Sequence, residues 1–344
     1  MSTAVLCVLL AAASVASLLT GAMEVSLTSL IAGDPEAIGI LLASRLPRLL
    51  ATILAGAGLS IAGLIMQQLC ANKFVSPTTG ATIASAQLGI LVAFAFMPGS
   101  TLVTRTLFAF AAAMAGTLAF VAFALRNPMR DPVMVPLIGI MFSSVIGGVT
   151  NLLAFSLGMT QALSTWSVGH FSLIVRGRYE MVFLVLPLIA AAWIFARRFN
   201  IVGMGRDFAR GLGVHYGAVM TLGLALAAAI TAAVVSVAGT IPYVGLVVPN
   251  IITILKGDDL RSTLADTALA GGLFVLLSDL AARLVIAPWE LPIELITGTA
   301  GSVVFIGLIL CRLRFGRRNP GLRGLLAVLG VRRPAGAPSR GGQA

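Results

Sequence analysis

Residues 45–77 read RLPRLLATILAGAGLSIAGLIMQQLCANKFVSP, in which two arginines precede a long run of apolar and small residues without a charge. Such a run is long enough to cross a bilayer as an α-helix. Lys73 follows it, so basic residues stand at both ends. Because a membrane helix normally keeps its Lys and Arg on the cytoplasmic side, one end of this helix departs from that rule.

The composition of the whole chain agrees with a membrane protein. Of its 344 residues, 58% are hydrophobic and only 10% are charged, whereas about a quarter of the residues in a soluble domain are charged. Cys7, Cys70 and Cys311 lie far apart with no paired spacing. We therefore expect neither a disulfide framework nor a metal site.

The apolar windows predict an all-α polytopic membrane protein with about ten transmembrane helices. The windows are residues 3–20, 46–70, 79–97, 103–125, 132–155, 179–196, 216–238, 240–256, 264–286 and 291–311. The eighth is short and contains Pro242 and Pro249. The segment between the first two carries Glu24, Asp34 and Glu36 but no basic residue before Arg45. Placing that segment outside puts both termini in the cytoplasm.

This topology places most of the 23 lysines and arginines inside, as the charge bias of membrane proteins requires. The exceptions on or near the outer face are Arg45, Arg48, Arg105, Arg176, Arg178 and Arg283. Residues 315–344 form a basic tail, which we expect to be disordered, cytoplasmic and attracted to anionic lipid. The net charge of +11 therefore indicates a membrane partner and no nucleic acid.

Motifs of intramembrane or ATP-driven catalysis are absent from the sequence. It contains no GxxxxGK[ST] loop, HExxH, CxxC or GxSxG, and His170 and His215 are predicted at opposite membrane faces. Asp279 precedes Arg283 by four residues, which favours an intrahelical pair over an ion-coupling site. We predict no catalytic residue. An ion-coupled secondary carrier and a scaffold or channel subunit remain alternatives.

Small residues recur at helical spacing in two of the predicted spans. Gly56 and Ser60 are typical of a helix-packing seam. A longer stripe of Gly139, Ser143 and Gly147 ends near Asn151. Such a stripe is usually a packing seam too, but it is our candidate for the lining of a wide pathway.

Five stretches, taken in order, resemble the FecCD-type permeases, the membrane subunits of ABC importers for iron–siderophores, haem and vitamin B12. They are RLPRLLATILAGAGLSIAGLIMQ with Asn72 and Pro77, STWSVGH (164–170), MGRDFARGLGV (204–214), GTIPYVGLVVPN (239–250) and SDLAARLVIAPWELPIELITGTAGSVVFIGLIL (278–310). The resemblance implies a type II ABC importer permease fold of ten helices per subunit, which we place in residues 1–314.

The resemblance also assigns the loop RRFNIVGMGRDFARGLGVH (197–215) to coupling with a cytoplasmic ABC ATPase dimer. That partner would bind ATP and Mg, so we expect no cofactor in this chain. The family usually has Glu where Arg206 stands. The alternative is an ordinary basic loop. The residues assigned to coupling are Gly205, Arg206, Asp207, Ala209, Leu212 and Gly213.

Permease arginines at positions matching Arg45, Arg48 and Arg283 meet glutamates of the binding protein in this family. We therefore predict that these three, as unpaired external arginines, dock a periplasmic or lipid-anchored siderophore-binding protein. Arg176 and Arg178 would form a secondary rim. Snorkelling to lipid phosphates, or pairing of Arg283 with Asp279, is the structural alternative.

Asn250 stands where the family commonly has His, which resembles the branch for catecholate siderophores such as enterobactin-, vibriobactin- or petrobactin-type ligands. The alternative is an Asn satisfied by neighbouring backbone. The chain is thus expected to be the permease subunit of a ferric-siderophore importer in the bacterial inner membrane. It would pair with a second permease, either a paralogue or an identical copy. Another iron chelate, haem or vitamin B12 is the alternative cargo.

Overall fold

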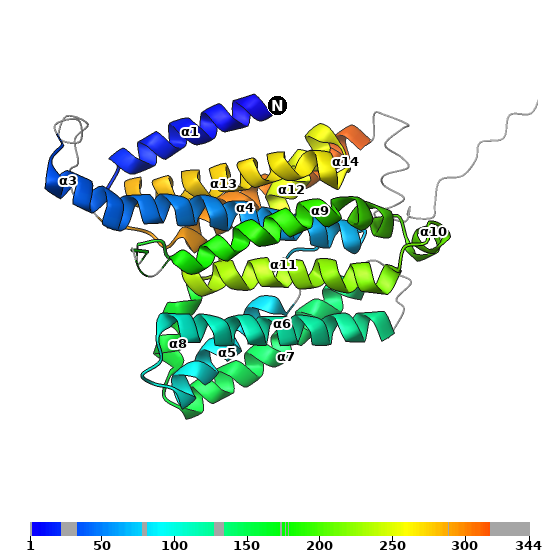
Figure 1. The fold of residues 1–344 in the computed structure, drawn as a ribbon, viewed down its shortest axis with the longest axis horizontal. Helices are drawn as coiled ribbons and strands as arrows, with labels where there is room; N and C mark the ends of the chain where they lie inside the picture. The colour runs from blue at the N-terminus through cyan, green and yellow to red at the C-terminus, as the bar shows by residue number, and fades with distance from the viewer. Residues whose placement is uncertain are drawn as a thin grey trace, which may run out of the picture. The chain divides into compact units, whose positions relative to one another are not determined.

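The computed structural model describes residues 2–21, 33–77, 81–126, 134–172, 174–175, 177, 179–287 and 289–316. The chain forms two compact units, residues 1–301 and 302–344, and the described part of the second is the helical stretch 302–316. Within the described residues there are helices and no named strand (Figure 1). Arg176 and Arg178, predicted to form a secondary rim, and the tail beyond Gly316 lie outside the described residues.

Each of the ten predicted windows contains a helix. These are α1 (Thr3–Leu19), α4 (Leu46–Leu69), α5 (Thr82–Phe96), α6 (Leu102–Arg126), α7 (Met134–Ser156), α9 (Val185–Gly203), α11 (Tyr216–Ala238), α12 (Val244–Lys256), α13 (Leu260–Leu284) and α14 (Ile293–Gly316). In the described part of the chain, six helices are long and apolar enough to cross a membrane, and four more are shorter. The all-α membrane class is therefore confirmed, and ten crossings stay a prediction.

Shorter elements connect the long helices. They are α3 (Pro35–Ile40), the π-helix η1 (Leu41–Arg45), α8 (Thr160–Ser167), the 3₁₀-helix η3 (Glu180–Leu184) and α10 (Arg206–Gly211). The helix that contains α4 thus begins at Pro35, where Asp34 caps the Glu36 amide, and not at residue 46 as the apolar window indicated. The π-turn precedes Pro47, which has no N–H to donate to the preceding turn.

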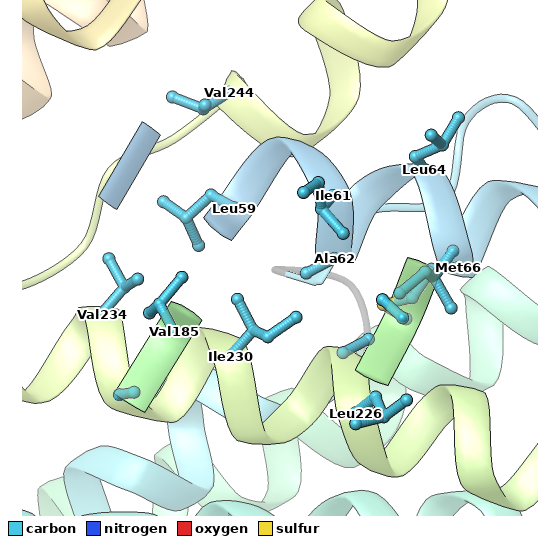
Figure 2. Packing of buried hydrophobic residues seen from close by; sticks show 14 of the residues in the cluster. Leu59, Ile61, Ala62, Leu64, Met66, Val185, Leu226, Ile230, Val234 and Val244 are labelled. Carbon is cyan, nitrogen blue, oxygen red and sulfur yellow. The ribbon is translucent and has the colours of Figure 1, made fainter. Parts of the chain in front are cut away.

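Helix α4 is buried along most of its length and packs against α13, α11, α12 and α9. Its apolar side chains meet Val185 of α9 and residues of α11 such as Ile230 and Val234 (Figure 2). Small residues allow the close approach: a Cβ on Gly56 would overlap the backbone of Gly271, so the predicted seam at Gly56 and Ser60 is confirmed. Helix α11 also packs against α5 and α6, so it connects these two helices to α4 and α9.

The proline-containing α12 depends on α4 for a hydrogen bond. Pro249 cannot donate to the carbonyl of Gly245, four residues earlier. The Gln67 side-chain amide of α4 donates to that carbonyl instead, at 3.3 Å. Asn250 donates to the carbonyls of Leu246 at 2.7 Å and Lys73 at 2.8 Å. Asn250 therefore has the backbone partners that the structural alternative predicted.

Candidate functional site

A cluster of charged side chains, here called the arginine cluster, lies at the N-terminal end of α4. It consists of Arg48 of α4, Asp279 and Arg283 of α13, and Glu290 of the loop that follows α13. Arg48 donates from Nε and Nη2 to Asp279 Oδ1, at 3.2 and 2.8 Å. Its Nη1 donates to both carboxylate oxygens of Glu290, at 2.9 and 3.0 Å. The guanidinium of Arg48 thus bridges α13 and the loop between α13 and α14.

Arg283 lies deeper in the same cluster and uses all five of its N–H donors within the chain. Nη2 donates to Asp279 Oδ2 and Ser17 Oγ, at 2.6 and 2.7 Å. Nη1 donates to the carbonyls of Ser17 and Thr20, and Nε donates to the carbonyl of Asp279. The predicted intrahelical pair with Asp279 is confirmed, and Arg283 also fastens the end of α1 to α13.

The interpretation of these arginines as unpaired is wrong. Arg48 and Arg283 share the carboxylate of Asp279, which is only 1% exposed. Arg45 is buried and donates to the Leu18 carbonyl. A charged group removed from water needs a partner, and the helices supply these partners. The docking role of Arg45, Arg48 and Arg283 stays a prediction.

Sequence reasoning missed Glu290 and missed the second partner of Asp279. Asp279 is 231 residues from Arg48, and Glu290 is 242 residues from it. A signal was available, because Glu290 is an acid in a loop predicted at the same face as the three arginines. Opposite charges at one membrane face are candidates for pairing.

The other end of α4 lies near α10, and the rise of an α-helix separates Arg48 from Gln68 by about 30 Å. Gly203, at the end of α9, lies directly against the Gln68 backbone. Gly205 and Gly213 flank α10 with φ of 108° and 73°, a region that favours glycine. The segment predicted for coupling is therefore a short helix between two glycine turns.

The side chains of the α10 segment divide into an inner and an outer set. Ala209 is fully buried. Met204, Phe208 and Leu212, spaced four apart, are exposed and apolar and are here called the α10 stripe. Leu212 was predicted, whereas Met204 and Phe208 were missed. Arg206 and Asp207 lie in the first turn of α10 and Arg210 in the last. The arrangement offers an apolar surface beside charged residues, which suits a protein partner.

Polar groups also fix the loop between α12 and α13. Lys73 pairs with Asp258 at 2.6 Å, and Asn200 of α9 donates to Asp259 at 2.6 Å. Burial alone would raise the pKa of Asp259, but hydrogen bonds from Ser262, Asn200 and the Arg261 amide lower it. The carboxylate therefore stays ionised as the N-cap of α13 at neutral pH.

The stripe predicted to line a pathway does not form one surface. Gly139 is buried, and the Ser143 hydroxyl accepts a hydrogen bond from the Ala81 amide at 3.0 Å. Gly147 is partly buried and Asn151 is exposed. The exposed face of α7 instead carries apolar residues such as Val145 and Leu152. A pathway role for the four residues stays a prediction.

Neither histidine contributes to a shared site. His170 donates its backbone amide to Ala238, at the C-terminal end of α11, whereas His215 is the N-cap of that 23-residue helix. Their predicted separation is confirmed. Within the described residues, no group of three or more His, Cys, Asp or Glu side chains is arranged to hold a metal ion.

A helical bundle with several membrane-length apolar helices and polar surfaces at both ends defines a multi-pass membrane protein. More particularly, the chain belongs to the FecCD transport family, whose model matches residues 9–311. The resemblance inferred from the five stretches is therefore confirmed.

Similar proteins agree over nearly the whole chain. The petrobactin import permease YclN of Bacillus subtilis (strain 168) is 38% identical over 305 residues, which cover 89% of this chain and 96% of that protein. The ferric-anguibactin transport permease FatD of Vibrio anguillarum is 36% identical over 294 residues, covering 86% and 94%. A metal-chelate type ABC transporter in an inward-facing conformation has a TM-score of 0.80 at 26% identity, covering 90% and 98%.

Proposed function

We propose that this chain is the transmembrane permease subunit of a binding-protein-dependent ABC importer for ferric siderophores in the bacterial inner membrane. The observation that carries the proposal is similarity along nearly its whole length to a petrobactin import permease. The petrobactin relative also agrees with the ligand type that Asn250 indicated. Both termini would lie in the cytoplasm.

In this proposal, each end of the bundle has a different partner. The α10 stripe and its charged neighbours dock the cytoplasmic ATPase dimer, which binds ATP and Mg and hydrolyses the nucleotide. The arginine cluster docks the binding protein that delivers the chelate. A second permease, either identical or a paralogue, completes the pathway, and ATP binding tilts the pair so that the chelate passes between them.

Iron siderophore is favoured over other cargoes by degree of similarity. The relatives also include a molybdate import permease from Haemophilus influenzae and a cobalamin import permease from Halobacterium salinarum, at 29% and 30% identity. Two siderophore permeases are more similar, at 38% and 36%. A wide pathway with few side-chain contacts leaves recognition of the chelate mainly to the binding protein.

The test is reconstitution with an ABC ATPase and a siderophore-binding protein of the same organism, identified by co-purification with this chain. Proteoliposomes are given radiolabelled iron bound to petrobactin, with and without ATP. We expect uptake that needs both partners and ATP, and that excess cobalamin or molybdate does not inhibit. Uptake driven by an ion gradient without ATP would establish a secondary carrier instead.

A further inference from the structure

Arg48 is the docking candidate whose guanidinium reaches solvent, yet two carboxylates of its own chain already bind it. Asp279 occupies the inner side and is 1% exposed. Glu290 occupies the outer side and is 30% exposed, while Arg48 itself is 13% exposed. Any acidic side chain that approaches from outside therefore meets Glu290 before it meets Arg48.

The two carboxylates are held very differently. Asp279 binds Arg48 through one oxygen and Arg283 through the other, so two guanidinium groups hold it in place. Glu290 has one ion-pair partner in the described part of the chain, and that pair lies near the surface. An ion pair near water loses little when it opens because water solvates both groups, whereas opening a buried pair strands a charge.

The net charge of the arginine cluster also favours an exchange of Glu290 for another carboxylate. Two arginines face two carboxylates, so the cluster is neutral while Glu290 is in place. Once Glu290 turns away, Nη1 of Arg48 has no carboxylate partner left among the described residues. Because this nitrogen now donates to both oxygens of Glu290, it can donate in the same way to the carboxylate of a partner.

The backbone that follows Glu290 is hydrogen-bonded to neighbouring segments, so the exchange needs only the Glu290 side chain. The Leu291 amide donates to the Ala282 carbonyl at 3.0 Å, and the Ile293 amide donates to the Gly169 carbonyl at 3.1 Å. A glutamate side chain has rotatable bonds enough to leave Arg48 while this backbone stays in place.

We propose that Glu290 is an internal substitute for a partner's carboxylate: it occupies Arg48 in the unoccupied permease and is displaced by an acidic side chain of the docking binding protein. This inference rests on the proposed function. Arg283 acts as a positioning residue, because it holds the Asp279 carboxylate that orients Arg48. Glu290 then lowers the affinity for the binding protein and favours its release after delivery.

The inference predicts a gain of affinity on removal of a negative charge. The permease–ATPase complex is placed in lipid nanodiscs, and the chelate-loaded binding protein is titrated by surface plasmon resonance at low and moderate salt. Glu290→Gln should tighten binding about two- to fivefold, the range that corresponds to a surface ion pair. In a background of Arg48→Gln, the same change should bring no gain, because no guanidinium is uncovered.

Glu294→Gln is the matched control. Glu294 lies in the first turn of α14, four residues beyond Glu290, and makes no ion pair with Arg48 in the described residues. The Glu294→Gln substitution removes the same charge as Glu290→Gln at the same end of the bundle. A general electrostatic effect on binding would therefore appear in both variants. We expect the affinity of the Glu294→Gln variant to equal that of the unchanged complex.

A purely structural role for Glu290 predicts the opposite pattern. Equal or weaker binding by Glu290→Gln, with an unchanged melting temperature, would overturn the inference while the proposed function stands. Should that variant be unstable, Glu290→Asp shortens the reach to Arg48 without changing the charge, and a gain in affinity is again required. If the unchanged complex does not bind the binding protein at all, the proposed function fails and the inference fails with it.

Discussion

At the scale of single residues, the two roles considered for these arginines, docking a partner and stabilising the fold, fall on different members of the arginine cluster. Arg283 is enclosed by α1 and α13 and has no donor left over. Arg48 has the same buried partner but also an edge toward solvent, where Glu290 binds. Burial therefore separates a residue that stabilises the fold from one that is available to a partner.

This difference predicts opposite phenotypes for two chemically identical substitutions. Arg283→Gln leaves Asp279 paired with Arg48 but removes the donors that bind the two Ser17 oxygens and the Thr20 carbonyl at the end of α1, so the free energy of unfolding should fall by about 1–3 kcal/mol. Arg48→Gln leaves Asp279 paired with Arg283, so stability should change little while binding-protein affinity falls. Thermal unfolding of the detergent-purified chain and a binding titration measure both. Equal destabilisation by the two variants would contradict the assignment.

Charge reversal of two arginines together, Arg45→Glu with Arg48→Glu, is a less decisive test of docking. We expect it to abolish uptake while ATPase assembly is preserved. However, a carboxylate at position 45 would face the Leu18 carbonyl, to which Arg45 now donates. A loss of uptake then needs a folding control, which the single change at Arg48 avoids.

At the scale of elements, close backbone contacts and exposed stripes follow from where small and large residues lie on a helix. A Cβ on Gly63 of α4 would overlap the carbonyl group of Gly245 in α12, and these backbone atoms cannot turn aside as a flexible side chain could. Nothing lies within 4 Å of a Cβ placed on Gly147 of α7. Alanine is therefore excluded at one glycine and accommodated at the other.

We expect Gly63→Ala to lower the free energy of unfolding by about 1–3 kcal/mol, because overpacking forces two helices apart. Gly147→Ala should be neutral or slightly stabilising, since alanine favours the helix. Melting temperatures of the two variants in the same detergent provide the comparison. A similar effect at both positions would show that helix propensity, and not the α4–α12 contact, decides the outcome.

The α10 stripe yields a second prediction for an element. Phe208→Ala with Leu212→Ala removes apolar surface that is exposed in this chain, so the fold should keep its stability while ATPase co-purification falls severalfold. Leu284→Ala, an equally exposed leucine at the arginine end, is the control and should leave ATPase binding unchanged. Full retention of the ATPase by the double variant would remove the stripe from the interface.

Ala209 probes the same segment from inside. We expect Ala209→Trp or Ala209→Glu to uncouple ATP hydrolysis from uptake. Ala209 is fully buried, so a large side chain at this position would displace α10 itself. The exposed positions are therefore the sharper test of a direct contact.

At the scale of the whole molecule, the topology depends on whether α13 crosses the membrane. Asp258 lies before this 25-residue helix and Trp289 after it, and both side chains are largely exposed. A helix of that length spans about 37 Å, more than the hydrocarbon core of a bilayer.

Single cysteines at positions 258 and 289 should therefore react with a membrane-impermeant maleimide from opposite sides. Cys7 and Cys311 are replaced first. Cys70 can stay, because it is buried and the reagent cannot reach its thiol. Labelling of both positions from one side would remove a crossing and contradict the ten-helix prediction.

The sequence alone determined the properties that are local along the chain. Hydropathy located the helices because burying an apolar run in lipid depends on composition and length. The spacing of Asp279 and Arg283 predicted their pair because residues four apart share one helix face. Ordered blocks from Arg45 to Leu310 were enough for the family.

Only the tertiary structure decided which side chains from distant segments meet. It brought Glu290 and Asp279 to Arg48, gave Gln67 to the carbonyl that Pro249 leaves open, and turned Ala209 inward and Phe208 outward. These outcomes depend on the rotation and depth of each helix against its neighbours. Those are set by packing of the whole bundle, and no periodicity within one segment encodes them.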